Sequence, residues 1–452
     1  MGLGVRYPLK ASVEDSYATD KENSMSSLNV NISGSLSLRI LAMCTSILML
    51  AGMATAGGGK ETVLYTFQGG TDGADPTGRL VADSAGNFYG TTALGGAAGF
   101  GTVFELVHEG GVWKEKVLYT FQGGSNDGAC PAGGLIFDKA GNLYGTTGQG
   151  SRVAFCLGTA IPTVFQLTLK GGAWTETVLY KFPQASYPNG DLIFDGKGDL
   201  YGTTYSGGTH GEGTVFRLTP NSKGSWTEGD LYSFTGLKGG AFPTAGVVFG
   251  KQGILYGTTS DGAGTAGTVF SLTPPGGSRR SWHHQVLYRF SGNADSGAPD
   301  TPLILRSGKL YGANAGFGSG NGALGTVFEL TPPAKKGGLW SETTLYDFTS
   351  SGGKDGIEPL GLLMDHAGNM FGATFWGGNN IWCGGTSSSG VVFEVSPHGT
   401  KWTEQVLYAF TDKLDGCHPT GGVIFGKDGA LYGVTGGGDG ESNPGTVYRV
   451  AH

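Results

Sequence analysis

The sequence has 452 residues, a formal net charge of −7 and only 14% charged residues. It contains no run of Lys and Arg, which argues against a nucleic-acid partner. Glycine is abundant, with 87 residues, but aromatic residues make up 11% of the chain. We therefore expect the glycines to form turns between many short strands rather than a disordered chain.

The first 56 residues have the pattern of a targeting segment. Arg39 precedes an apolar run at residues 40–53, and Ala54-Thr55-Ala56 follows it. A basic residue, an apolar core and an A-x-A site are the three parts of a secretory signal peptide. The run is shorter than the roughly 20 residues that span a bilayer, and an N-terminal membrane anchor is the alternative interpretation. We expect export to the periplasm or the exterior, and a mature chain without a membrane span.

Four short β patterns then follow one another and repeat. The first is an apolar strand such as residues 135–137, which begins four residues after a proline. The second contains Tyr-Gly, as at residues 142–147, and the third is Gly-Thr-Val-Phe, as at residues 101–104. The fourth carries Trp and Tyr, as at residues 113–121. Glycine-rich and proline-containing segments between these patterns predict turns.

The Tyr-Gly strand recurs every 55 to 61 residues. Its aromatic residues are Tyr89, Tyr144, Tyr201, Tyr256, Tyr311, Phe371 and Tyr432. Seven four-strand units predict an all-β, seven-bladed β-propeller with four antiparallel strands per blade. The seventh unit ends after its third strand, and residues 61–67 match a fourth strand. We therefore expect strand 61–67 to complete the last blade and to close a single domain, residues 57–452.

A tryptophan lies six residues before the tyrosine in six of the seven fourth strands. These residues are Trp113, Trp174, Trp226, Trp282, Trp340 and Trp402. Because side chains alternate along a strand, the even offset predicts that Trp and Tyr share one face. Packing between neighbouring blades is the interpretation we prefer over a ligand platform.

Together these motifs resemble a known family. GNLYGTT, GTVF, WTExVLYxF and a DGxxP loop are similar to the tandem GloVer repeat of bacterial secreted proteins. Members are grouped as "choice-of-anchor" proteins, because different C-terminal surface anchors follow the repeats. The resemblance covers roughly residues 61–450, and this chain departs from the family's pattern in ending at His452 without an anchor. The resemblance implies neither a reaction nor catalytic residues.

Four cysteines remain once Cys44 is removed with the targeting segment: Cys130, Cys156, Cys383 and Cys417. An even number in an exported chain favours disulfides. Cys156 and Cys383 lie in the two longest loops between second and third strands. Cys130 and Cys417 lie in loops that lead into the first strands of blades two and seven. Both kinds of loop share one rim of a propeller, so we predict the pairs Cys130–Cys156 and Cys383–Cys417, with free thiols as the alternative.

The loops that lead into the first strands also carry acidic residues: Asp72, Asp75, Asp127, Asp295, Asp355, Glu358 and Asp415. Carboxylate oxygens are the ligands that calcium prefers. We take Asp72, Asp127, Asp355 and Asp415 as candidate calcium ligands, calcium being the one cofactor considered. Asx turns are the alternative, because Asp before Gly forms them readily.

The sixth blade has an aromatic loop with four candidate ligand-binding residues: Trp376, Asn379, Asn380 and Trp382. Indole rings stack on flat ligand surfaces, and amides donate and accept hydrogen bonds, which suits a sugar. Aromatic side chains that merely cover the core are the alternative.

The sequence lacks H-E-x-x-H, C-x-x-C, G-x-S-x-G, phosphate-loop and dinucleotide motifs. We favour an exported, monomeric, non-enzymatic scaffold that binds an extracellular protein or polysaccharide through its loop rim. The alternative is a propeller hydrolase or lyase that acts on polysaccharide with carboxylates at the mouth of the central channel.

Overall fold

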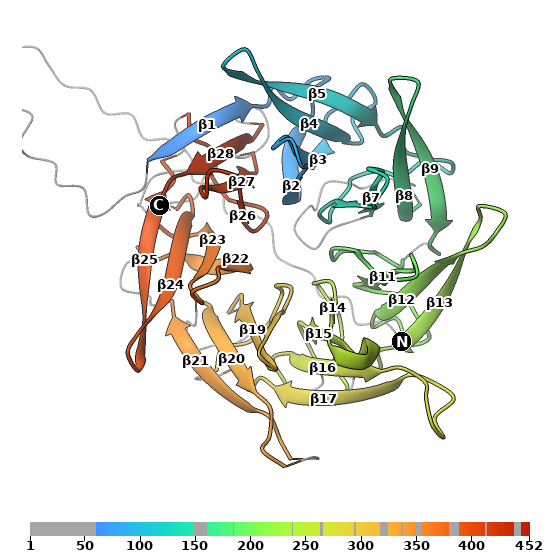
Figure 1. The fold of residues 1–452 in the computed structure, drawn as a ribbon, viewed down its shortest axis with the longest axis vertical. Coiled ribbons are helices and arrows are strands. Elements are labelled where there is room, and N and C mark those ends of the chain that lie inside the picture. The colour runs from blue at the N-terminus through green and yellow to red at the C-terminus, as the bar shows by residue number, and fades with distance from the viewer. Residues whose placement is uncertain are drawn as a thin grey trace, which may run out of the picture. The chain divides into compact units, whose positions relative to one another are not determined.

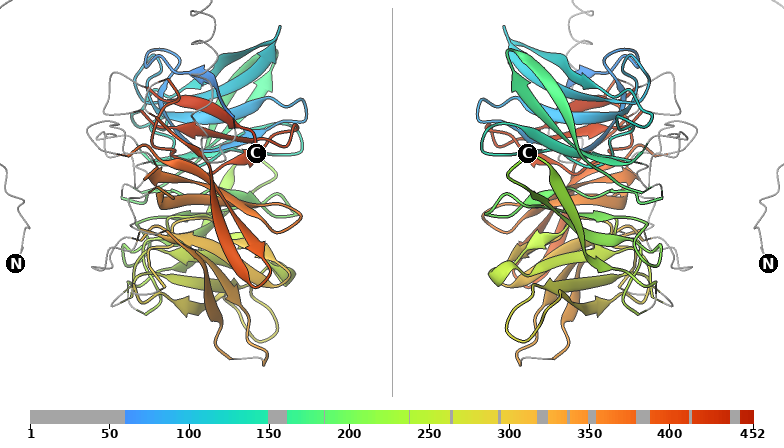
Figure 2. Two further views of the ribbon diagram at one scale, coloured as in Figure 1. Left: turned by 90° about the vertical axis from the view of Figure 1, so that its left-hand side faces the viewer. Right: turned by 90° about the vertical axis from the view of Figure 1, so that its right-hand side faces the viewer.

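The computed structural model describes residues 60–148, 161–183, 185–236, 238–262, 265–292, 295–316, 324–335, 338–348, 354–378, 388–411, 414–437 and 444–452. Within these residues the strands form seven antiparallel sheets of four strands, arranged as blades in a ring (Figure 1). The predicted seven-bladed all-β propeller is confirmed. Seen edge-on, the ring has two faces on which the connecting loops lie (Figure 2). The described residues contain no helix with the length and hydropathy of a bilayer span.

Each blade runs from an inner strand a, nearest the axis, through b and c to an outer strand d. Blade one contains β2 (Ala74–Ala82), β3 (Phe88–Leu94), β4 (Thr102–Glu109) and β5 (Val112–Thr120). Blade two contains β6 (Ile136–Phe137), β7 (Leu143–Thr147), β8 (Thr163–Lys170) and β9 (Ala173–Lys181). Blade three contains β10 (Ile193–Phe194), β11 (Leu200–Thr204), β12 (Thr214–Pro220) and β13 (Trp226–Ser233).

The other four blades follow the same order. Blade four contains β14 (Val248–Phe249), the short 3-10 turn η1 (Lys251–Gly253), β15 (Leu255–Thr259), β16 (Thr268–Thr273) and β17 (His283–Arg289). Blade five contains β18 (Ile304–Arg306), β19 (Lys309–Asn314), β20 (Thr326–Thr331) and β21 (Ser341–Asp347). Blade six contains β22 (Ile357–Met364), β23 (Met370–Trp376), β24 (Val391–His398) and β25 (Lys401–Ala409). Blade seven contains β26 (Ile424–Phe425), β27 (Leu431–Thr435), β28 (Thr446–Val450) and β1 (Glu61–Thr66).

Strand β1 closes the ring from the other end of the chain, as Figure 1 shows. It pairs antiparallel with β28, so that Glu61 lies opposite Val450 and Thr66 opposite Thr446. The N–H of Phe67 donates to the Gly445 carbonyl at 3.0 Å and extends this pairing. The prediction that strand 61–67 completes the last blade is confirmed. Closure pairs two edges that would otherwise be open to association.

An aromatic ring at the end of each d strand packs onto the next blade. Phe67 lies edge-on to Phe104 of β4, with ring centroids 5.2 Å apart. The same contact joins Phe121 to Phe165, Phe182 to Phe216, Phe234 to Phe270, Phe290 to Phe328, Phe348 to Phe393 and Phe410 to Tyr448. These rings are buried. The core is therefore a series of clusters, one between each pair of adjacent blades.

The prediction that Trp and Tyr of a d strand share one face is wrong. Trp113 packs in the cluster between blades seven and one, whereas Tyr119 packs in the cluster between blades one and two. A β-bulge in the pairing of β4 with β5 makes Val117 and Tyr119 face consecutive residues of β4 and skips Leu118. The extra residue inverts the alternation of faces. The role of both rings in packing between blades is confirmed.

A glycine and a proline meet at the junctions between blades. Gly267, which precedes β16, has φ 98°, and a Cβ there would lie 2.6 Å from Cδ of Pro299 in the next blade. Gly213 and Pro243 stand in the same relation, also at 2.6 Å. The glycine of the Gly-Thr-Val motif and the proline of the following loop are thus two halves of one contact. This explains why both recur with the same period.

We expect Gly267→Ala to lower the free energy of unfolding by about 3 kcal/mol. A left-handed backbone costs a residue with a Cβ about 1–2 kcal/mol, and overpacking costs about 1–3 kcal/mol more. Urea denaturation measures the change. The matched control is Gly229→Ala in β13, where a Cβ would meet nothing within 4 Å. If both variants are equally stable, the junction does not depend on this glycine.

Candidate functional site

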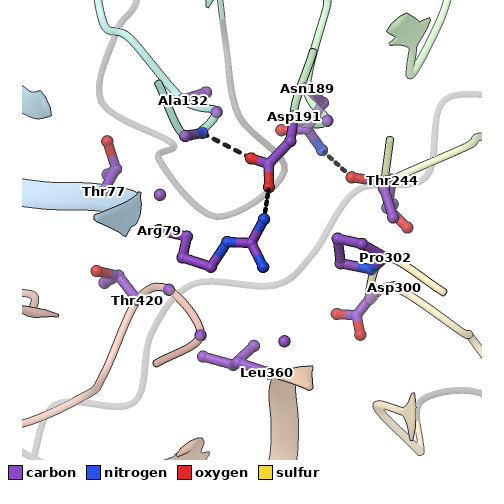
Figure 3. A pocket seen from close by; sticks show the side chains of 18 of the residues that line it. Thr77, Arg79, Ala132, Asn189, Asp191, Thr244, Asp300, Pro302, Leu360 and Thr420 are labelled. Carbon is purple, nitrogen blue, oxygen red and sulfur yellow. Dashed lines mark hydrogen bonds and ion pairs between the residues drawn. The ribbon is translucent and has the colours of Figure 1, made fainter. Parts of the chain in front are cut away.

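The segments that follow the prolines line the axis of the ring. In blades one to four, for example, these are residues 77–79, 132–134, 189–191 and 244–246. They enclose a cavity of about 270 Å³ to which every blade contributes (Figure 3). The fixed interval between each proline and the first apolar residue is the length of this lining segment. This spacing therefore marks the channel wall as well as the start of the strand.

Hydrogen bonds between blades fix the channel wall. The hydroxyl of Thr77 donates to the Pro131 carbonyl of the next blade at 2.8 Å. Thr420 donates to the Pro76 carbonyl at 2.5 Å. The Asn189 amide donates to the Thr244 carbonyl at 3.3 Å. Each contact satisfies a polar group near the axis, so the wall is a connected network.

One ion pair crosses the channel. The guanidinium of Arg79 in blade one lies 3.3 Å from the Asp191 carboxylate in blade three, as Figure 3 shows. The other oxygen of Asp191 accepts the Gly134 N–H at 2.8 Å. Arg79 is the one lysine or arginine among the described residues that line the cavity. The other acidic side chains among the described lining residues are Asp75 and Asp300.

The residue before the proline has positive φ in six of the seven blades: Asp75, Cys130, Phe242, Ala298, Glu358 and His418. Each N–H donates to a carbonyl of the preceding blade; the Glu358 N–H, for example, donates to Leu324 at 2.8 Å. Non-glycine residues rarely adopt this conformation, which often occurs at binding sites. Burial raises the pKa of Asp75, and a hydrogen bond from the Gly437 backbone partly offsets this shift. The same turn thus presents a different side chain in each blade.

A groove of about 980 Å³ opens beside the channel over blades three to six, and we call it the rim groove. Its lining residues are Tyr205, Phe242, Thr244, Ser260, Asp261, Gly262, Thr265, Ala266, Ser291, Gly292, Ala298, Asp300, Ala315, Glu358, Phe375 and Trp376. It shares Thr244, Asp300 and Phe375 with the channel cavity, so the two hollows are continuous. The lining comes from both d–a and b–c loops, which lie on this one face.

Two aromatic groups stand in the rim groove. Tyr205 stacks on Phe242, with centroids 5.0 Å apart and an interplanar angle of 24°. Phe375 stacks on His418 at 4.9 Å and 9°, and Trp376 lies edge-on to Phe375 at 4.7 Å. Nε2 of His418 lies 3.2 Å from the Ser388 carbonyl, which only accepts, so Nε2–H donates. These contacts hold the rings in place while leaving Tyr205, Phe242, Phe375 and Trp376 partly exposed.

Of the predicted sugar-binding residues, Trp376 lies in the rim groove. Asn379, Asn380 and Trp382 lie outside the described residues. Four further lining residues were not among the predicted site residues. They are Tyr205, Phe242 and Asp300, which lie in three loops, and Phe375, which lies at the end of β23. An alignment of the seven repeat units shows the positions at which their side chains differ most. The residue before the proline is one of these variable positions.

The four candidate calcium ligands lie in separate blade junctions. Asp72, Asp127, Asp355 and Asp415 each accept a hydrogen bond from the tyrosine of the preceding d strand, at 2.9, 3.0, 3.0 and 2.7 Å respectively. Asp72, Asp127 and Asp415 also accept a backbone N–H of the same loop. Among the described residues no group of three or more His, Cys, Asp and Glu could hold a metal ion. The structure thus places these residues in loop-capping positions.

The described cysteines, Cys130 and Cys417, are buried beside the channel mouth. Both are disulfide-bonded. Cys156 and Cys383 lie outside the described residues, so the pairs Cys130–Cys156 and Cys383–Cys417 stay predictions. Peptide mapping without reduction would test them.

The comparison with protein families gives one match, which spans the propeller. A model described as the Gloeobacter/Verrucomicrobia repeat matches residues 52–159, 157–324, 222–381 and 262–452. No curated protein matches the sequence.

Several solved structures are similar at low identity. The extracellular domain of a putative hybrid two-component system from B. thetaiotaomicron has a TM-score of 0.51 and 10% identity, over 87% of this chain and 40% of that one. A putative glucose dehydrogenase from Thermus has a TM-score of 0.41 and 14% identity, over 87% and 100% of the two chains. The soluble aldose sugar dehydrogenase of Escherichia coli has a TM-score of 0.42 and 15% identity, over 87% and 99%. These likenesses concern the fold alone.

Proposed function

Since the chain belongs to the Gloeobacter/Verrucomicrobia repeat family and closes into a propeller, we propose that it is an exported binding protein that holds an oligosaccharide in the rim groove. Export is supported by the basic residue, apolar run and A-x-A site of residues 39–56. Binding is supported by the groove itself. The repeat framework explains most motif residues as packing contacts, whereas the groove residues differ from blade to blade.

The observation that carries this proposal is the pairing of fixed aromatic rings with polar groups in one hollow. At about 980 Å³ the groove is at the upper end of the roughly 300–1,000 Å³ typical of ligand sites. Tyr205, Phe242 and Trp376 offer ring surface for stacking, while Thr244, Ser260 and Asp300 offer hydrogen-bonding groups. A sugar ring has apolar C–H faces and polar hydroxyl groups. It therefore needs both a ring to stack on and groups that hydrogen-bond with its hydroxyls.

We expect Phe242→Ala and Trp376→Ala each to weaken oligosaccharide binding roughly tenfold, because each removes stacking surface worth about 1 kcal/mol or more. A glycan array identifies the oligosaccharide, and titration calorimetry measures its affinity. The matched control is Phe100→Ala, which removes a half-buried aromatic ring from the b–c loop of blade one, outside the groove. Melting curves check that all three variants fold.

Binding that survives both groove substitutions would place the site elsewhere. If no glycan binds, the proposal fails, and a protein partner becomes the candidate to test by pull-down.

A polysaccharide hydrolase or lyase is the second candidate, favoured by one observation. Asp300 and Glu358 line the same groove, and paired carboxylates carry glycoside hydrolysis. Assaying each bound glycan for released reducing or unsaturated ends separates the candidates. Product that disappears in Glu358→Gln while binding persists would make the protein an enzyme. Binding without product supports the binding protein.

A further inference from the structure

The channel cavity is enclosed at its sides, whereas the rim groove is open. Every blade contributes to the cavity wall, and neighbouring blades touch there through their backbones. A Cβ on Gly78 of blade one would lie 2.7 Å from the backbone of Gly133 in blade two. One on Gly361 of blade six would lie 2.7 Å from Cα of Gly422 in blade seven. Because the groove shares Thr244 with the cavity, a chain can pass from the groove to the axis but not out through this wall.

The ion pair of Arg79 and Asp191 lies on the path along the axis. Figure 3 shows the two side chains reaching toward each other across the cavity from blades one and three. A chain that enters from the groove therefore meets this pair with its tip. The cavity has about 270 Å³ and the groove about 980 Å³, which suits one terminal unit in the cavity and several units in the groove.

Both residues of the pair depart from the pattern of the repeat. The three residues that follow each proline are mostly Gly, Thr or Ala, and the charged ones are Arg79, Asp191 and Asp300. The propeller framework therefore does not need a charge at these positions. Stability does not explain the pair either, because the Arg79 side chain is 40% exposed and an ion pair so open to solvent contributes little. A ligand explains it better.

The pair presents hydrogen-bond donors and acceptors side by side. A guanidinium carries five N–H groups, and among the described residues the structure gives that of Arg79 one side-chain partner, Asp191. The Asp191 oxygens accept from Arg79 and from the Gly134 N–H, and each carboxylate oxygen can accept a second hydrogen bond. Hydrogen bonds to charged groups are roughly twice as strong as those between neutral groups. Adjacent hydroxyls of a sugar fit this arrangement, because one can accept from Arg79 while its neighbour donates to Asp191.

We propose that the channel cavity and the rim groove form one site that binds the end of an oligosaccharide chain. A neutral terminal sugar lies in the cavity with two adjacent hydroxyls on Arg79 and Asp191. The sugars that follow lie in the groove against its aromatic side chains. This inference rests on the proposed function and adds that the ligand is recognised by its end.

A terminal uronic acid suits the pair less well than a neutral sugar. Its carboxylate would be attracted by Arg79 but repelled by the carboxylate of Asp191 a few ångströms away. Two hydroxyls, in contrast, form favourable hydrogen bonds with both members of the pair.

The test is calorimetric titration of the full protein with cellohexaose, xylohexaose, mannohexaose and maltohexaose. Each is used in three forms: unmodified, reduced to the alditol, which opens the ring at one end, and methylated on the hydroxyls of the terminal unit at the other end. We expect a hexaose that binds to lose about tenfold or more in affinity when one of its ends is modified, since charge-assisted hydrogen bonds are lost. Modification of the other end should leave its affinity unchanged.

Three variants locate the effect in the cavity. Arg79→Gln and Asp191→Asn should each reduce the discrimination between unmodified and end-modified hexaose while retaining binding in the groove. Ala132→Leu narrows the cavity without altering the pair, and should do the same should either of the first two fail to fold. The matched control is Arg217→Gln, which alters an arginine of similar exposure, 42%, that is paired with Asp199 and lines neither the cavity nor the groove.

The other outcomes overturn the inference in distinguishable ways. If all three forms of a hexaose bind equally, the chain lies across the groove, and the proposed function stands without recognition of an end. Discrimination that survives all three cavity variants would place the terminal sugar elsewhere. If no hexaose binds, both proposals fall.

Discussion

Removing residues 57–67 is expected to lower the free energy of unfolding by more than about 5 kcal/mol and to make the protein associate. Phe67 is 1% exposed, and loss of a buried phenylalanine side chain alone costs about 3–5 kcal/mol. The deletion also removes every partner of β28 on its outer side, from Glu61 opposite Val450 to Thr66 opposite Thr446. Size-exclusion chromatography and thermal melting measure both effects.

Adding the missing strand back as a peptide sharpens this test. A synthetic peptide of residues 57–69 should restore the melting temperature and the monomer, since the groove left beside β28 has one matching strand. A peptide of the same composition in scrambled order is the control. A shortened protein that stays monomeric and melts unchanged would show that β1 is dispensable for the ring.

The closure was predictable because each motif serves one contact that is repeated around the ring. The glycine of Tyr-Gly shows this well. A Cβ at Gly145 would lie 2.6 Å from the ring of Phe165 on the neighbouring strand, and Gly90 and Phe104 repeat the relation at 2.6 Å. The Tyr-Gly and Gly-Thr-Val-Phe motifs therefore recur together because they pack together.

The faces of the d strands were not predictable by the same reasoning. Simple alternation assigns Trp113 and Tyr119 to one face, but the bulge that skips Leu118 places them in different clusters. A bulge changes neither the length nor the composition of a strand. Its only sequence trace is that Val117 and Leu118 are both apolar, which a regular half-buried strand also tolerates.

The rim groove was the hardest feature to find, for a different reason. Its rings and carboxylates come from segments far apart in the sequence, such as Tyr205, Asp300 and Trp376. No local spacing relates these residues, because the ring brings them together only when it closes. The sequence marks Asp75 and Glu358 as loop residues, but their places in the channel cavity and in the rim groove depend on a left-handed turn that sequence composition does not reveal.

A belt of half-buried glutamates is expected to make the stability of the folded protein depend on pH. The d strands of six blades carry Glu61, Glu115, Glu176, Glu228, Glu342 and Glu404 at equivalent positions. Most of them face the loop aspartate of the preceding blade; Glu404, for example, faces Asp355, and Glu115 faces Asp72. One carboxylate oxygen each of Glu61, Glu115, Glu176 and Glu404 is buried without a hydrogen-bond partner among the described residues.

Burial, and secondly the nearby carboxylates, raise the pKa of these groups. The pKa of Glu61, Glu115, Glu176 and Glu228 rises to about 7, that of Glu404 to about 8, and that of Glu342 rises as well. Glutamates of the unfolded chain titrate near 4.5. Between these values the folded protein binds more protons than the unfolded chain, so its stability falls as pH rises. His284, at the equivalent position in blade four, opposes this trend because burial lowers its pKa to about 4, but it is one group against six.

We therefore expect the protein to be more stable at about pH 5 than at about pH 8, the reverse of a protein held by salt-bridged carboxylates. After allowance for solvent screening, each glutamate contributes about 1 kcal/mol to the difference. Glu404→Gln and Glu115→Gln should raise the stability at pH 8 and flatten the profile, because a neutral amide mimics the protonated acid. The control Glu109→Gln alters an exposed carboxylate whose pKa is lowered by Lys116 and Lys114, and should leave the slope unchanged. Urea denaturation across this pH range measures the profile, and a stability that rises from pH 5 to pH 8 would show that the belt is ionised in the folded protein.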